Sequence, residues 1–169
     1  MDKVFIRNII TNEEEELIFT DEKVYDPSVS LRQKDRDTDE IYISYSTPKT
    51  QNRTYLYNIK TKEKKLVKEQ IIPSGHEPND YIVERLECPS HDGRVVPITI
   101  TRHKNTPIDG SAELLLYGYG SYGHSMSPTF SSTRLSLIKR NIIWATAHIR
   151  GGMERGMKWW KEGKLLNKK

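Results

Sequence analysis

The sequence predicts a protein of mixed β and α/β class, with antiparallel strands first and a strand–helix–strand unit afterwards. Residues 40–46 alternate between apolar and polar side chains, as a half-buried strand does. By contrast, residues 114–116 and 142–148 are apolar runs without such alternation, and the segment between them carries helical spacing. Because buried parallel strands show continuous apolar runs, this order predicts a parallel sheet covered on both faces.

The first part of the chain reads as short strands joined by polar turns. Strands are expected at residues 4–10, 17–19, 40–46, 53–59 and 65–69. The last three, with their tight polar connections, form a β-meander of the kind found in propeller blades. Sandwiches use the same unit, so the meander alone does not specify a propeller.

The middle of the chain changes character. Residues 71–79 contain two prolines and a glycine and are expected to form a linker. Residues 81–87 and 94–102 then read as strands joined by a turn at Asp92-Gly93. Pro97 lies inside the second of these strands, which favours an edge position, because proline has no N–H to donate to a neighbour.

Two helices are expected in the last third of the chain. Ser127-Pro128 has the composition of a helix start, with serine as the cap and proline in the first turn. Phe130 and the following apolar residues then keep helical spacing up to the strand at 142–148. A second helix is expected over residues 154–166.

Composition limits the classes of function. The 169 residues are 35% hydrophobic and carry a formal net charge of +4, with one cysteine, Cys88. No disulfide can form within the chain, and no apolar run approaches the ~18 residues of a membrane span. We expect a soluble, cytoplasmic protein that binds neither membrane nor nucleic acid, because the basic segments at 60–68 and 158–169 resemble solvated lysines on a hairpin and a helix. A nucleic-acid patch is the alternative reading of these segments.

The most informative segment is residues 113–123, an apolar run that leads into alternating glycines and tyrosines. It satisfies the G-x-G-x-x-G pattern, but no helix opens at the third glycine and no acidic residue follows about 20 positions later, so nucleotide binding is not expected. Ser121 does not fit the G-x-S-x-G nucleophile pattern either, because Tyr119 stands where that pattern has glycine.

The histidines and Arg150 complete the list of candidate groups. The five histidines show no metal-ligand spacing, so we expect no metal and no cofactor. His148 ends a buried strand and is interpreted as a satisfied core or sheet-edge residue. Arg150 follows that strand at the position where α/β sheets place their sites, and it either binds a carboxylate or pins neighbouring loops.

Four motifs in order resemble the prolyl oligopeptidase family of serine peptidases, in particular its oligopeptidase B branch. They are Leu-Tyr-Gly-Tyr-Gly-Ser-Tyr-Gly at 116–123, Phe-Ser-Ser-Thr-Arg-Leu at 130–135, Ala-His-Ile-Arg-Gly-Gly at 147–152 and Glu-Gly-Lys-Leu-Leu at 162–166. The resemblance implies a cytoplasmic enzyme that joins a β-propeller to an α/β-hydrolase domain and cuts short peptides after Arg or Lys. Residues 1–72 would be the end of the propeller, and residues 73–169 the start of the hydrolase sheet.

The same resemblance assigns roles to individual residues. Tyr119 matches the tyrosine whose hydroxyl helps hold the oxyanion, and Tyr122 matches an aromatic residue that lines the substrate pocket. Arg150 falls in a loop near the site and is a candidate for substrate binding. Two departures stand out: Met153 replaces a family glycine, and Ser127 and Thr129 occupy positions where the branch often has acidic residues that receive a basic substrate side chain.

The nucleophile and the triad aspartate and histidine lie further along in the family than Lys169. We therefore expect these residues to be a piece of such a peptidase, inactive alone, unless a second chain supplies the triad. Half a parallel sheet would also leave an unpaired edge and an uncovered apolar face. A non-catalytic binding or scaffold protein is the alternative from another class.

Overall fold

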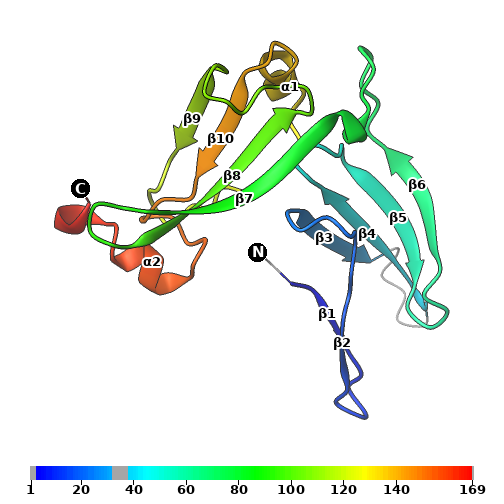
Figure 1. The fold of residues 1–169 in the computed structure, drawn as a ribbon. Helices are drawn as coiled ribbons and strands as arrows, with labels where there is room; N and C mark the ends of the chain where they lie inside the picture. Colours follow the sequence, from blue (N-terminus) through cyan, green and yellow to red (C-terminus); the bar gives the residue numbers. More distant parts are fainter. Residues whose placement is uncertain (1–2, 32–37, 169) are drawn as a thin grey trace.

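The computed structural model describes residues 3–31 and 38–168, which form two four-stranded sheets and a separate β-hairpin (Figure 1). The strands are β1 (Phe5–Arg7), β2 (Glu14–Glu16), β3 (Asp26–Leu31), β4 (Glu40–Ser46), β5 (Arg53–Asn58), β6 (Lys64–Glu69), β7 (Tyr81–Pro89), β8 (Val95–His103), β9 (Leu114–Gly118) and β10 (Ile143–Ala147). The helices are α1 (Ser132–Ile138) and α2 (Met157–Lys161), with 3₁₀ turns η1 (Pro78–Asp80) and η2 (Leu165–Asn167). The mixed β and α/β composition agrees with the sequence-based expectation, although helices are few.

The first sheet is an antiparallel meander in the order β3-β4-β5-β6. Its core gathers around Ile43 on β4, which is fully buried, together with Phe19, Tyr45 and Tyr57. Strand β4 has the predicted bounds, and its apolar face with Ile43 and Tyr45 is more deeply buried than Tyr42 and Ser44 on the other face, which is the condition that produces alternation.

One expectation for this region was wrong, and one strand was missed. Residues 17–19 are not a strand, since β2 lies at Glu14–Glu16, and Leu17 and Phe19 enter the core from irregular backbone. Strand β3 was not predicted, because Pro27 and two serines hide its pattern. It lies at the edge of the sheet, where a proline is tolerated.

The second sheet is mixed, in the order β7-β8-β10-β9. β8 is antiparallel to both neighbours, whereas β9 and β10 are parallel and are joined through α1. The prediction that Pro97 marks an edge strand was wrong, because β8 lies inside the sheet. Proline fits there because its register with β10 has already ended, at Ile98 opposite Ala147. Only its carbonyl is used on that side, accepting from the N–H of His148 at 2.9 Å.

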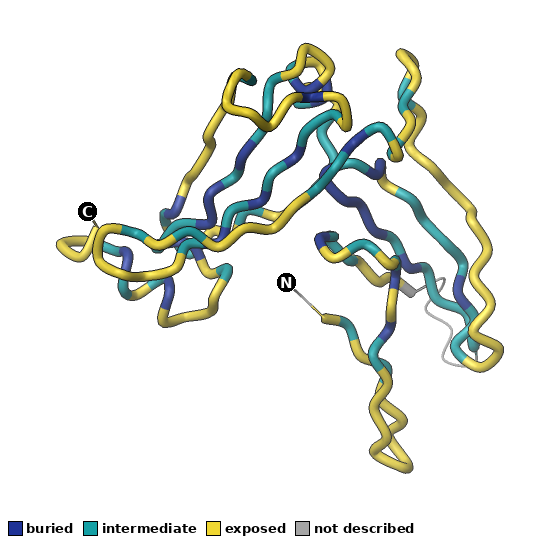
Figure 2. Tube along the Cα trace, viewed as in Figure 1, coloured by how far each residue is buried: buried dark blue, intermediate teal, exposed yellow. Residues whose placement is uncertain are grey.

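Strand β9 is the exposed edge of the second sheet (Figure 2). Leu114 and Leu116 are 54% and 61% exposed, and all five residues of the strand are classed as exposed. The expectation that residues 114–116 are covered on both faces was therefore wrong for the described residues. The expectation of an unpaired edge with an uncovered apolar face is confirmed.

Both helices are shorter than the sequence predicted. α1 begins at Ser132, not at Ser127-Pro128, because the hydroxyl of Ser131 accepts from the N–H of Arg134 and caps the first turn. Phe130 lies before this cap and packs against a second core cluster of Tyr81, Leu135 and Ile138. The expected helix over 154–166 is reduced to α2, which starts after Gly156 and is followed by a turn at Gly163, whose N–H donates to the carbonyl of Trp160 at 3.1 Å.

The linker joins the two sheets through His76. Its Nε2 lies 2.6 Å from the carbonyl oxygen of Lys49, and its ring centroid lies 5.0 Å from those of Tyr81 and Phe130. The histidine therefore contacts the first sheet by a hydrogen bond and the second by aromatic packing. None of the helices in the described part of the chain is long and apolar enough to cross a membrane.

The buried position of Ile43 makes the first sheet sensitive to a cavity. We expect Ile43→Ala to lower the free energy of unfolding by about 2–5 kcal/mol, because it removes buried methylene and methyl groups and leaves a void. Val67→Ala on the exposed strand β6 is the matched control and should change the free energy by less than about 1 kcal/mol. Urea unfolding followed by circular dichroism measures both, and equal effects would contradict the assignment of the core.

Candidate functional site

The Tyr-Gly loop leaves the carboxyl end of β9 and folds back on itself. Gly120, Tyr122 and Gly123 all have positive φ angles, of 57°, 56° and 69°. The N–H of Gly123 donates to the carbonyl of Gly151 at 2.8 Å, and the N–H of His124 donates to the carbonyl of Ser121 at 3.0 Å. The loop is thus tied to the segment that follows β10.

Close backbone packing between Gly120 and Gly151 fixes this arrangement. A Cβ atom on Gly151 would overlap the carbonyl oxygen of Gly120, and one on Gly120 would overlap the side chain of Ile149. Both residues also have positive φ, which favours glycine. The third residue of the motif, Met153, does not share the positive φ of Gly151 and instead approaches Gly123 with its side chain.

The structure brings Tyr119 and Tyr122 to one open depression of about 640 Å³, which Tyr117, His124 and Met126 also line. The Tyr119 ring meets the His124 ring edge to face, with centroids 5.8 Å apart, and is 43% exposed. No residue of the described part of the chain bonds its hydroxyl, so this hydroxyl is free to donate to a ligand. Tyr122 is 91% exposed at the rim of the depression.

Arg150 lies away from this depression and is engaged by the protein itself. One guanidinium nitrogen lies 2.5 Å from a carboxylate oxygen of Asp92, in the turn between β7 and β8. The carboxylate that the sequence suggested for Arg150 is therefore supplied, in this structure, by Asp92. The pair holds that turn against the Arg-Gly-Gly loop, which is the pinning role left open by the sequence.

Ser127 and Thr129 lie in irregular backbone between the Tyr-Gly loop and α1. Ser127 lines a second cavity, described below, and the carbonyl of Thr129 accepts from the Arg134 guanidinium at 3.2 Å. Neither provides a charged group.

A polar network with a buried centre at Thr99 and His148 was missed by the sequence reasoning. Arg85 on β7 donates to the hydroxyl of Thr99 at 2.6 Å, and that hydroxyl lies 2.8 Å from Nε2 of His148. On the other side of the imidazole, Nδ1 lies 3.6 Å from Oε1 of Glu154, too far for a good hydrogen bond. The N–H of Met126 donates to the same Oε1 at 2.9 Å. The only sequence signal was a pair of threonines in β8, Thr99 and Thr101, on the face that proves to be buried.

Glu154 is the acidic member of this network and lies at the opposite end from Arg85. Burial raises the pKa of Glu154, but the nearby His148 and the N–H of Met126 lower it, and the net result is a pKa below the usual range. The carboxylate is therefore ionised at neutral pH. Its Oε2 atom and Nδ1 of His148 are both buried and have no hydrogen-bond partner in the described residues.

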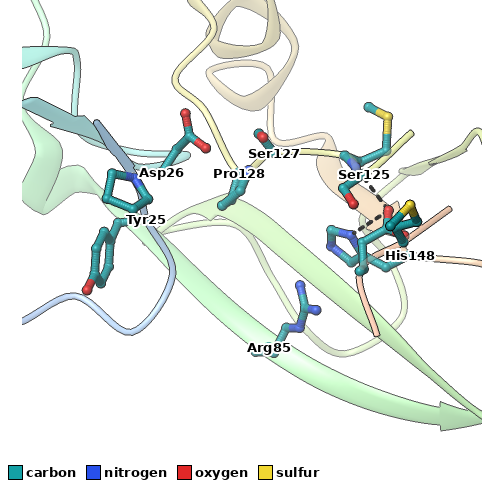
Figure 3. Close-up of a pocket in the computed structure, with 11 residues that line it drawn as sticks. Tyr25, Asp26, Arg85, Ser125, Ser127, Pro128 and His148 are labelled. Carbon is teal, nitrogen blue, oxygen red and sulfur yellow. Dashed lines mark hydrogen bonds and ion pairs between the residues drawn. The ribbon is translucent and has the colours of Figure 1, made fainter. Parts of the chain in front are cut away.

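Glu154 and His148 face a second cavity of about 90 Å³ between the two sheets (Figure 3). The first sheet contributes Tyr25, Asp26 and Pro27, and the second contributes Arg85 and the segment 125–128. Met126 lines both this cavity and the depression at Tyr119. The two spaces therefore share one wall.

The described residues do not assemble an accessible nucleophile and base. Hydroxyl–imidazole contacts occur at Thr99–His148 and Ser90–His91. Thr99 is buried and is hydrogen-bonded to a guanidinium, and the second pair is formed by exposed sequence neighbours 3.4 Å apart. Ser121 contacts Lys168 and not a histidine. No group of three metal-ligating side chains occurs in the ranges 3–31 and 38–168. What the site offers is a phenol donor, an aromatic depression and a charged cavity.

Known proteins resemble this chain in both sequence and fold. No protein-family model matches the chain. Dipeptidyl aminopeptidase BI of Pseudoxanthomonas mexicana is 39% identical over 164 residues, and Protease 2 of Moraxella lacunata is 33% identical over 161. These matches cover 96% and 95% of this chain but 22% and 23% of the relatives. Oligopeptidase B from Trypanosoma brucei, solved with covalently bound antipain, superposes with a TM-score of 0.86 at 32% identity, over 98% of this chain and 24% of that one.

The chain thus spans between a fifth and a quarter of the length of these relatives. The matches run through both sheets, including the Tyr-Gly loop and the Arg-Gly-Gly loop. On this evidence the chain belongs to the prolyl oligopeptidase family of serine peptidases.

Proposed function

We propose that the chain forms the end of a β-propeller and the start of the α/β-hydrolase domain of an oligopeptidase-B-like serine peptidase. Residues 1–72 would belong to the propeller and residues 73–169 to the hydrolase. The first sheet supports this division because it is a four-stranded antiparallel meander, the usual form of a propeller blade. The second sheet supports it because β9, α1 and β10 make a strand–helix–strand unit with parallel pairing.

The observation that carries the proposal is the position of Tyr119. It lies on the loop after β9, which is the third strand of the second sheet in chain order. α/β-hydrolases take one oxyanion donor from the loop after their third strand. A phenol hydroxyl without a protein partner can donate to the negative oxygen that develops when a peptide carbonyl is attacked. Tyr122, beside it, would pack against the substrate.

The substrate class follows from the oligopeptidase B resemblance. We propose short peptides cut after Arg or Lys, in the cytoplasm. Ser127 and Thr129 supply no carboxylates to receive a basic side chain, so this preference rests on the resemblance and is tested by comparing Arg, Lys and Pro substrates directly.

The triad would come from outside these residues. The free edge of β9 and its two uncovered apolar faces are suited to pairing with a further strand, which would continue the sheet next to the Tyr-Gly loop. A triad-bearing segment, in the same or a second chain, would then stand close to Tyr119. A non-catalytic scaffold is the second candidate, and the lack of an accessible nucleophile–base pair in the described residues favours it; a closed oligomer with a cooperative melt would support it.

The polypeptide of these 169 residues alone should hydrolyse no Arg- or Lys-containing fluorogenic peptide. Acyl transfer needs a nucleophile and a base, and an oxyanion donor cannot replace them. Fluorescence release is measured with the purified polypeptide. Turnover that a serine-directed inhibitor abolishes would contradict this prediction.

Tyr119→Phe should lower kcat about 10²–10³-fold in a completed enzyme, because it removes one oxyanion donor, and KM should change little. A suitable enzyme is a chimera in which this chain replaces the matching residues of the Moraxella lacunata protease. Tyr55→Phe, on β5 of the first sheet, removes a phenol hydroxyl elsewhere and is the matched control. A Tyr119→Phe chimera with unchanged kcat would exclude the assigned role.

A further inference from the structure

We propose that Asp92 is a positioning residue for Tyr119, because through Arg150 it holds the Arg-Gly-Gly loop at the place where the Tyr-Gly loop packs on it. The inference rests on the proposed oxyanion role of Tyr119 and adds a residue of the β7–β8 turn on which that role depends. It is carried by a continuous series of contacts that runs from the Asp92 carboxylate to Gly120, the neighbour of Tyr119 in the chain.

The hydroxyl end of Tyr119 is not held by the protein. No group of the described residues bonds the hydroxyl, and the ring meets His124 only edge to face, with centroids 5.8 Å apart. The residue is 43% exposed. A side chain with a free tip takes its position from its backbone, and an oxyanion donor has to lie within about 3 Å of the developing charge. The backbone of the Tyr-Gly loop must therefore be fixed from outside the loop.

The outside anchor of the Tyr-Gly loop is the backbone of Arg150 and Gly151. The carbonyl of Gly151 accepts from the N–H of Gly123 at 2.8 Å. A Cβ atom on Gly120 would lie 2.7 Å from the carbonyl oxygen of Arg150, so the two main chains are in direct contact. Lys168 also donates to the carbonyl of Gly120, but it is an exposed side chain. The main-chain contacts are thus the ones that set the height of the loop.

The same backbone is enclosed on its other side. Gly163 is buried, and a Cβ atom there would overlap the main chain of both Arg150 and Gly151. The N–H of Gly151 donates to the carbonyl of Trp159 at 3.1 Å. Arg150 and Gly151 therefore lie between two glycines, Gly120 and Gly163, and cannot shift without moving the Tyr-Gly loop.

Asp92 fixes the side chain of Arg150. One guanidinium nitrogen lies 2.5 Å from Oδ2 of Asp92, and the two side chains are only 19% and 31% exposed. The other carboxylate oxygen accepts from the N–H of Arg94 at 3.2 Å, so the turn itself orients the carboxylate. The guanidinium of Arg94 in turn lies 3.3 Å from Oε1 of Glu162, just after α2. Figure 1 shows the β7–β8 turn lying beside α2.

The charge on Asp92 is the part of this arrangement that a substitution can remove cleanly. Burial raises the pKa of the Asp92 carboxyl, but the N–H of Arg94 and the guanidinium of Arg150 lower it, and the net result is a pKa below the usual range. The carboxylate is therefore ionised at neutral pH. Asp92→Asn keeps an oxygen for the N–H of Arg94, and hence the turn, but removes the charge that holds Arg150.

Amide hydrogen exchange in the 169-residue polypeptide tests the inference without any turnover. Asp92→Asn should speed exchange of the Gly123 N–H at least about fivefold, because the carbonyl that it bonds is no longer held in place. Asp80→Asn is the matched control, since it breaks the Asp80–Lys104 pair of 2.7 Å at the opposite end of the β7–β8 hairpin. Gly123 exchange that is unchanged in Asp92→Asn, or equally fast in both variants, would overturn the proposal. Should Asp92→Asn fail to fold, Arg150→Gln breaks the same pair from the other side.

A double-mutant cycle in the Moraxella lacunata chimera tests whether Asp92 acts through the Tyr119 hydroxyl. Asp92→Asn should lower kcat about tenfold with little change in KM, because a small misplacement of the donor is costly. In the Tyr119→Phe chimera the same substitution should change kcat less than about twofold, since the hydroxyl that it positions is gone. An equal loss in both backgrounds would overturn the inference. A Tyr119→Phe chimera with unchanged kcat contradicts the proposed oxyanion role, whereas unchanged Gly123 exchange contradicts this inference alone.

Discussion

The backbone contact between Gly120 and Gly151 is the constraint on which the rest of the site depends. It allows the loop after β9 and the loop after β10 to pack directly against each other, with the N–H of Gly123 donating to the carbonyl of Gly151. The first loop positions Tyr119 and Met126, and the second positions Glu154. Because the contact involves main-chain atoms, no side-chain rotation can relieve a larger residue there. The Asp92–Arg150 pair reinforces the same layer from the β7–β8 turn.

The two sheets contribute to the site in different ways. The second sheet supplies the phenol, the carboxylate and the guanidinium, whereas the first sheet closes the cavity with Tyr25, Asp26 and Pro27. His76 connects the two by bonding to Lys49 and packing on Tyr81. The charged cavity thus exists only while the sheets stay in contact, although the Tyr119 depression needs the second sheet alone.

Sequence reasoning succeeded where one local rule dominates. Strand β4 was found because a half-buried strand alternates, and the Tyr-Gly loop was singled out because glycines concentrate where backbones approach closely. It was wrong about the start of α1, which it placed at Ser127-Pro128, because the hydroxyl of Ser131 caps the first turn instead. It could not find the network of Arg85, Thr99, His148 and Glu154, because strand order and register bring these residues together from positions up to 69 residues apart.

Strand β9 has a consequence for every measurement on this polypeptide in solution. Its free backbone groups and exposed leucines can pair with an identical strand as well as with a different one. Such self-pairing would make the state of the sample depend on concentration, with monomer at high dilution and paired species above a threshold. Melting temperatures and titration curves of this polypeptide can therefore be compared only when they are recorded at the same protein concentration.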